Sequence, residues 1–336
     1  MRLRISTIII VLFLKFNFGT SQDIHYSQFY NSPININPAQ VGIFNGDTRV
    51  NASLRDQWRG VPVPWTTVSI SYDRKFIKYN SKKSFFSAGL LYNYDRQGDA
   101  QISFNNLNLA LSYTRLLNEN NILTGGLMLG FASRGFDPEE LTWDRQWVNG
   151  ELFTSIQSGE SFDMERVNFL ENALGINYRY QKSTRTKVDF GVGAYHILQP
   201  ESNFYSNSTQ KLPRRYSLSA IGSVKLTDKL DLQVNVMHQI QEKYNETILG
   251  ALGRVYLNEK RGKVTTLELG LGYRTNHALF PTLGIRYNQF YFSGSYDIDL
   301  SDFGSEHGKN GGPEVHFRYI MTSVKPLRYF KICPIF

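Results

Sequence analysis

The strongest constraint on this chain is an alternation of apolar and polar residues with a period of two, which recurs along most of its length. In the stretch FYFSGSYDID, residues 290–299, most large apolar side chains occupy one parity, and serine and aspartate occupy the other. This pattern is typical of a strand with two unlike faces. The runs that share it span 47–56, 65–76, 85–94, 102–114, 121–131, 169–180, 187–197, 215–226, 230–240, 246–257, 264–274, 280–288, 289–299 and 313–322.

The apolar parity of these runs indicates lipid as the outer solvent rather than the closed core of a soluble sandwich. Several runs carry tyrosine near an end, as at Tyr72, Tyr113 and Tyr180, where a strand leaves hydrocarbon for the headgroup layer. Most runs are close to the roughly 9 to 11 residues that a tilted strand needs to cross a membrane. We therefore predict an all-β fold, a single transmembrane antiparallel β-barrel of about fourteen strands (about 12 to 16) that spans residues 47–322.

The connections between the runs fall into a short set and a long set that alternate along the chain. Every second connection is short, as in TDK at 227–229, whereas the intervening set contains the long stretches 132–168, 198–214 and 300–312. Outer-membrane barrels place short turns in the periplasm and longer loops outside the cell. This sorting predicts a barrel whose first strand starts on the periplasmic side.

The N-terminus has the features of a secretory signal. Arg2 and Arg4 precede a short apolar stretch, and Gly19 and Ser21 are the small residues expected before a cleavage site. We interpret residues 1–21 as a signal peptide of an exported protein; the alternative is a buried N-terminal helix. The last stretch, 323–336, is expected to be a C-terminal periplasmic tail.

The segment that precedes the first strand, residues 22–46, carries too much apolar surface for a free tail. Tyr26, Phe29 and Tyr30 are its first aromatic residues, and its two prolines disfavour helix and ladder pairing. We expect contact to order this segment, either as a plug in the barrel mouth or as a dock for a periplasmic partner. Trp58, just after the first strand, joins the same candidate set.

Charged residues on the inward parity predict a charge network in the lumen. Arg49 and Arg55 on the first strand are expected to pair with inward carboxylates near the seam, because an unpaired charge in a narrow lumen is costly. The candidate members are Arg49, Arg55, Asp297, Asp299, Glu314 and Arg318.

No motif predicts catalysis, a cofactor or a metal site. The six histidines lie far apart, and the spacing of Asp297, Asp299 and Asp302 lacks the glycine turn and distal glutamate of a calcium loop. A barrel hydrolase that uses His316 and Asp297 as catalytic residues is the alternative. The basic residues behind the net charge of +8 are scattered, which disfavours nucleic-acid binding. Within strands, glycines such as those in GLMLG and DFGVGAY indicate bends or close backbone approach.

Several blocks of sequence are more specific than a barrel requires. The chain carries SQFY at 27–30, NPA at 37–39, DFGVGAYHILQPESNF at 189–204, SYDIDLS at 295–301 and GGPEVHFRY at 311–319. With Asp23, Gly42, Gly46, Arg49, Arg55, Gln57 and Trp58, these blocks resemble the PorP/SprF family of outer-membrane proteins of the type IX secretion system. The resemblance covers essentially all of the chain after the leader.

This resemblance implies a non-enzymatic role in secretion and gliding motility rather than catalysis. The partners it implies are outer-membrane lipid, periplasmic lipoproteins and ring components of the apparatus, and in some members a large surface adhesin with a type B C-terminal domain. No motif separates the motor-linked subtype from the adhesin-dedicated one. The alternative is a passive pore or uptake channel for small solutes, although charged side chains crowding the lumen favour a closed barrel.

Overall fold

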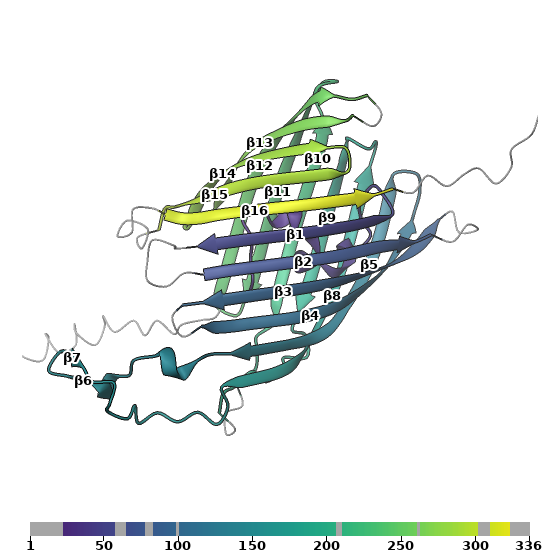
Figure 1. Cartoon of the computed structure of the whole chain (residues 1–336). Coiled ribbons are helices and arrows are strands. Elements are labelled where there is room, and N and C mark those ends of the chain that lie inside the picture. The colour runs from purple at the N-terminus through teal and green to yellow at the C-terminus, as the bar shows by residue number, and fades with distance from the viewer. Residues whose placement is uncertain are drawn as a thin grey trace, which may run out of the picture.

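Fourteen antiparallel strands close into one barrel in a computed structural model, which describes residues 23–57, 65–77, 83–98, 101–205, 210–260, 263–301 and 310–322 (Figure 1). Each strand pairs with its neighbour along the barrel, and β1 pairs with β16 to close the sheet. The strands are β1 Thr48–Gln57, β2 Trp65–Phe76, β3 Ser84–Gln97, β4 Ile102–Leu116, β5 Asn121–Gly135, β8 Arg166–Gln181, β9 Lys187–Tyr195, β10 Arg215–Lys225, β11 Leu230–Gln241, β12 Tyr244–Asn258, β13 Thr265–Arg274, β14 Ala278–Tyr287, β15 Phe290–Asp299 and β16 Asn310–Met321.

The predicted fold class is confirmed, since each predicted run overlaps one strand of the barrel. The main difference is at β5 and β8, which continue to pair as far as Gly135 and Arg166, beyond the predicted ends. The extension lies beyond the part of the two strands that carries outward apolar residues. The sequence alternation that marks lipid contact is therefore absent there, although the backbone pairing of the two strands continues. The expected leader 1–21, the tail 323–336 and Trp58 lie outside the described residues.

The wall has an apolar outer face and a mostly polar inner face, as the parity of the runs predicts. On β4, Leu107 and Leu109 are 56% and 47% exposed, whereas Asn106 and Asn108 between and beside them are buried. Closure leaves no unpaired strand edge to face lipid, where backbone groups find no hydrogen-bond partner. Among the described residues, no helix is both long and apolar enough to cross a membrane.

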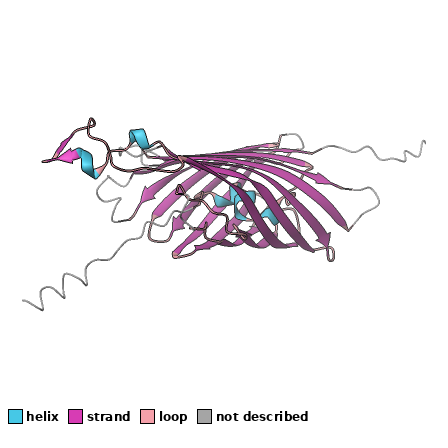
Figure 2. Cartoon of the chain, turned by 90° about the horizontal axis from the view of Figure 1, so that it is seen from below, coloured by secondary structure: helices cyan, strands magenta, loops and turns pink. Residues whose placement is uncertain are grey.

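The two ends of the barrel differ in their connections, as the sequence predicts (Figure 2). The end that we call the short-turn end carries the connections 77–83, 117–120, 182–186, 226–229, 259–264 and 288–289. The opposite end, the long-loop end, carries the long connections 136–165, 196–214 and 300–309 together with four shorter ones. The first of these contains a small hairpin that the sequence pattern did not predict, β6 Trp147–Val148 paired with β7 Glu151–Leu152.

Residues 23–46, here called the luminal segment, lie inside the barrel, where the helices η1 Phe29–Asn31, α2 Pro33–Ile36 and η2 Pro38–Gln40 are seen in Figure 2. The segment starts near the long-loop end, where Asp23 contacts His196 just after β9. It ends at the short-turn end, where the backbone N–H of Asp47 donates to the carbonyl of Met321. The chain therefore runs the length of the lumen before β1 begins.

The orientation of the barrel is open to a labelling test. If the long-loop end faces the outside of the cell, a short epitope inserted between Asn149 and Gly150, in the exposed β6–β7 turn, should bind antibody on intact cells. The same epitope at Asp228, in the β10–β11 turn, should bind antibody only after the outer membrane is permeabilised. The opposite pattern would invert the orientation.

Candidate functional site

The luminal segment contacts the barrel wall through apolar clusters and through buried hydrogen bonds and ion pairs. Two apolar clusters hold the segment in place. Ile34 and Val41 pack on inward residues of β3, β4, β5 and β8 together with Tyr195, and Phe29 and Ile36 pack on inward residues of β11, β12 and β14. The wall residues are Leu91, Ala110, Met128, Ala173 and Tyr195 in the first cluster, and Met237, Ile248 and Phe280 in the second.

These wall residues are the ones that sequence reasoning missed. They break the alternation because each places an apolar side chain on the otherwise polar inner face. Leu91 follows the lipid-facing Leu90 and is 1% exposed, against 50% for Leu90. A large apolar residue on the inward parity is therefore the signal that marks where a barrel wall contacts something other than water.

Glycines of the wall let the backbone of the luminal segment approach closely, as the in-strand glycines predicted. A Cβ atom at Gly126 would lie 2.5 Å from the backbone nitrogen of Ala39, and one at Gly193 would lie 2.4 Å from the carbonyl oxygen of Ile36. Neither contact can be relieved by a side-chain rotation. Gly125 next to Gly126 points outward, and a Cβ there would meet nothing within 4 Å.

Buried carboxylates of the wall bind the start of the segment through its backbone. The two oxygens of Glu314 accept from the backbone N–H groups of Ser27 and Gln28, each at 2.8 Å. The hydroxyl of Ser27 donates to Asp297 at 2.6 Å. On the other side of β1, the hydroxyl of Tyr26 donates to Ser69 of β2 at 2.7 Å.

Arg55 lies at the centre of the charged contacts. Its guanidinium is 2.7 Å from Asp297 and 3.9 Å from Glu314, and it donates to the carbonyl of His25 at 2.9 Å. Arg274, which sequence reasoning did not name, approaches Asp297 at 3.6 Å. Arg274 also pairs with Glu246 at 3.1 Å. Both residues occupy inward-facing positions of their strands, and this is the sequence feature from which the pair could have been predicted.

The other expected members of the network are not brought together, and for Arg49 the expected partners are wrong. Arg49 pairs with Asp73 at 2.8 Å, because the two residues are direct partners in the β1–β2 register. Arg318 instead lies over the ring of Tyr291, 4.4 Å from its centroid. Asp299 accepts hydrogen bonds from Ser301 at the long-loop end. Strands rise about 3.3 Å per residue, so residues at opposite ends of the seam cannot pair.

A separate charged cluster fixes the first described residue of the segment at the long-loop end. The imidazole of His196 lies 2.7 Å from Asp23 and 3.2 Å from Glu171, and Arg215 lies 3.3 Å from Asp23. Burial alone would lower the pKa of His196, but the two carboxylates raise it to about 10. The charged imidazolium therefore bridges the segment to β8.

The residues considered for catalysis and metal binding do not converge. His316 shares a hydrogen bond with Ser53 at 2.9 Å, whereas Asp297 is engaged by Arg55 and Ser27. In the part of the chain that the structure describes, no group of three or more His, Cys, Asp or Glu side chains could hold a metal ion. Asp302, the third residue of the calcium-like spacing, lies outside that part.

Removing the aromatic anchors tests the contribution of the luminal segment to folding. Replacing Phe29 and Tyr30 with serine forfeits apolar burial worth about 2 to 3 kcal/mol each, so little heat-resistant, folded barrel should remain on gels. Phe153→Ser, an exposed aromatic on the long connection 136–165, should leave the folded fraction unchanged. A double variant that folds normally but loses co-purification with periplasmic lipoproteins would favour the docking interpretation instead.

Comparison with known proteins gives one family match. The model of the family described as type IX secretion system membrane protein PorP/SprF matches residues 18–319. No curated protein matches the chain.

Solved structures with a similar fold are outer-membrane barrels. The Ralstonia pickettii toluene transporter TbuX is 12% identical with a TM-score of 0.52, over 87% of this chain and 94% of its own. A Pseudomonas aeruginosa FadL homologue is 12% identical with a TM-score of 0.51, over 86% of this chain and 94% of its own. The P. putida toluene transporter TodX is 9% identical with a TM-score of 0.50, over 88% and 95%. At these identities the likeness shows the fold alone, and with the family match it places the chain in the outer membrane.

Proposed function

Because the chain belongs to the PorP/SprF family of type IX secretion system membrane proteins, we propose that it is a non-enzymatic outer-membrane component of that apparatus. The observation that carries this proposal is the occupied lumen. The chain uses its own residues 23–46 to fill the space that a diffusion channel would leave open to water, and it holds them with buried ion pairs and apolar clusters. Such a barrel is suited to binding other components rather than to passing solutes.

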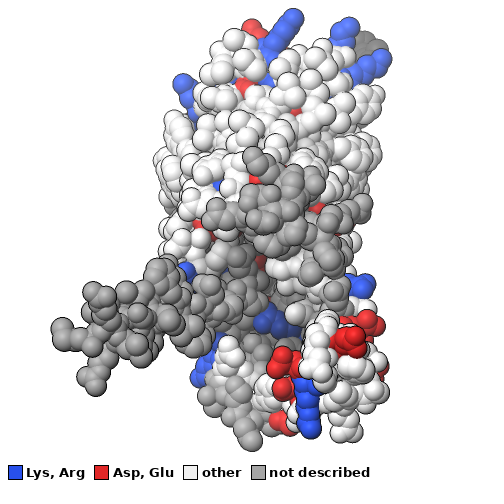
Figure 3. All heavy atoms as spheres, turned by 90° about the vertical axis from the view of Figure 1, so that its left-hand side faces the viewer, with Lys and Arg blue, Asp and Glu red and all other residues white. Residues whose placement is uncertain are grey.

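The finer role that we propose is support for the export and surface attachment of a large adhesin with a type B C-terminal domain. A structured projection at the long-loop end supports it. Phe136 packs edge-on against Phe162 and Phe204, with ring centroids 4.8 and 4.7 Å apart, and so joins two connections into one unit. Trp147 and Phe153 remain 50% and 42% exposed on it. A group of Asp and Glu side chains is seen low in Figure 3. The acidic residues of the connection 136–165 are Asp137, Glu139, Glu140, Asp144, Glu151, Glu160, Asp163 and Glu165.

The second candidate role within the same apparatus is a link between the outer membrane and the periplasmic motor-coupled ring. Family membership implies association with other components of the type IX system, and lipoproteins of the ring are the partners that we propose at the short-turn end. A passive pore or uptake channel is the alternative outside the apparatus. The transporter names of the similar barrels do not favour it, because those barrels share only the fold.

Deletion of the gene, followed by complementation, separates these roles. In the adhesin-dedicated role, one large surface protein should disappear from the cell surface while the other cargo of the type IX system is secreted normally. In the ring-linked role, secretion of all type IX cargo and gliding should fail together. Normal surface proteins and normal gliding in the deletion strain would refute both roles and leave the channel.

A loop variant tests the surface contact without disturbing the lumen. Replacing 147–152, which contains β6 and β7, with a Gly-Ser linker removes the exposed hairpin but none of the barrel pairs. The barrel should assemble in normal amount, while surface adhesin falls severalfold. Unchanged adhesin on cells that carry this variant would place the contact elsewhere.

A further inference from the structure

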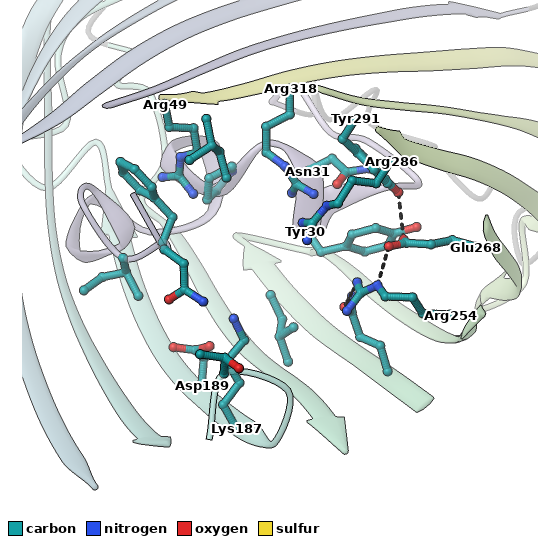
Figure 4. A pocket seen from close by; sticks show the side chains of 18 of the residues that line it. Tyr30, Asn31, Arg49, Lys187, Asp189, Arg254, Glu268, Arg286, Tyr291 and Arg318 are labelled. Carbon is teal, nitrogen blue, oxygen red and sulfur yellow. Dashed lines mark hydrogen bonds and ion pairs between the residues drawn. The ribbon is translucent and has the colours of Figure 1, made fainter. Parts of the chain in front are cut away.

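A cavity of about 300 Å³ opens at the short-turn end, between the luminal segment and the wall, and is shown in Figure 4. Tyr30 and Phe44 of the segment form one side of it. Strands β9, β12, β13, β14 and β16 contribute the other side. Its charged lining residues are Arg49, Arg179, Lys187, Asp189, Arg254, Glu268, Arg286 and Arg318.

Half of the cations in this lining are neutralised by carboxylates. Each of the three pairs joins direct partners on neighbouring strands, and the distances are 2.8 Å for Arg49–Asp73, 2.7 Å for Arg179–Asp189 and 2.5 Å for Arg254–Glu268. Glu268 also accepts from the hydroxyl of Tyr291 at 3.0 Å, so its oxygens are both used. The acids of the lining are therefore committed to other partners.

The remaining three cations have no acidic partner. Within the described residues, Lys187, Arg286 and Arg318 form no ion pair, and the buried Nε of Arg318 has no hydrogen-bond partner. Figure 4 shows Arg286 and Arg318 pointing towards Tyr30 from one side of the cavity and Lys187 lying on the other side.

Like charges that converge in a partly dehydrated space are unfavourable unless an opposite charge joins them. We propose that this cavity is a binding site for a compact phosphate-type anion that enters from the short-turn end, with Lys187, Arg286 and Arg318 as its ligands. Guanidinium groups present paired N–H donors that match the oxygens of phosphate, and an ammonium adds a point charge. The volume lies at the lower limit of small-molecule pockets, which favours a compact anion over an acidic segment of a protein.

Calorimetric titration of the purified full-length protein in detergent tests this site, with inorganic phosphate and pyrophosphate as probes in a chloride buffer. Wild-type protein should bind at least one of them saturably, and Arg286→Gln should weaken binding about tenfold or more, as expected for the loss of one charge-assisted contact. Lys211→Gln removes an equal charge from the exposed long-loop end and should bind like wild type. No saturable binding by wild type, or equal affinity in Arg286→Gln, would overturn the proposal. Binding of an aspartate-rich hexapeptide without binding of either phosphate would overturn the ligand class.

Thermal unfolding provides a second measurement, which does not require a difference in phosphate affinity to be resolved by calorimetry. Arg286→Gln removes an unpaired cation, so the variant should fold and melt at or above the wild-type temperature without ligand. Phosphate should raise the melting temperature of wild type and raise that of the variant much less, because only the native site binds it. An equal rise in both proteins would contradict the site. Since the test uses the purified barrel alone, its outcome is independent of the proposed role in secretion.

Discussion

Gly126→Val should prevent the luminal segment from seating, whereas Gly125→Val should have no such effect. At position 126 the first added carbon already lies 2.5 Å from the nitrogen and 2.6 Å from the Cα of Ala39, and both atoms are backbone. The segment would have to withdraw from the wall and lose its apolar clusters. Overpacking typically costs about 1 to 3 kcal/mol, and we expect the upper end of this range or more, because no side-chain movement relieves the clash.

The measurement for this pair is the yield of heat-resistant barrel together with protease cleavage within residues 23–46. Gly126→Val should give a low yield or a segment that protease cleaves in the assembled barrel. Gly125→Val adds the same side-chain atoms to the neighbouring position of β5, but the new side chain faces open space on the exposed outer face. Equal protection of the segment in both variants would show that it does not depend on the close approach at Gly126.

Arg55→Leu should destabilise the barrel by about 3 to 5 kcal/mol, because it leaves two buried carboxylates without their central cation. Asp297 and Glu314 are 2% and 1% exposed, so water cannot replace the guanidinium. The hydrogen bond to the carbonyl of His25 is lost as well, which loosens the start of the luminal segment. Urea unfolding of the purified protein measures the change in the free energy of unfolding.

Two controls identify the cause of that loss. Arg214→Leu removes an exposed arginine at the long-loop end and should change the stability little. Adding Asp297→Asn and Glu314→Gln to Arg55→Leu removes both carboxylate charges, of which Asp297 would keep only the more distant Arg274, and should recover part of the lost stability. If Arg55→Leu alone unfolds at the wild-type urea concentration, the charged contacts at the seam contribute nothing to the fold.

The barrel itself could be predicted from the sequence because its signal is local. Each strand carries its own alternation, and the inward and outward parity survives errors of a few residues at the strand ends. In β4, for example, the apolar Leu107 and Leu109 face outward and the polar Asn108 between them faces inward, so three consecutive residues are enough to predict which face is which. The sorting of short and long connections is equally local, because it needs only the spacing of the runs.

The contacts inside the lumen could not be predicted in the same way, since they join residues far apart along the chain. The partner of Arg49 depends on the β1–β2 register, in which it lies opposite Asp73, and the alternation of residue types within each strand does not fix that register. The approach of Ala39 to Gly126 depends on how a segment of three short helices folds inside a closed wall. The placement of Lys187 and Arg286 in the lining of one cavity likewise depends on the tilt and stagger of the barrel.

Conductance in a planar lipid bilayer tests the central claim, that the chain fills its own lumen and therefore acts as a secretion component rather than a pore. Purified, heat-resistant full-length protein should insert without producing steady current steps, while a general porin in the same bilayer produces them. Tyr26 and Phe29, buried at 3% and 2% exposure, should keep the lumen occupied under these conditions. Uniform, long-lived current steps from the folded wild-type protein would contradict the account.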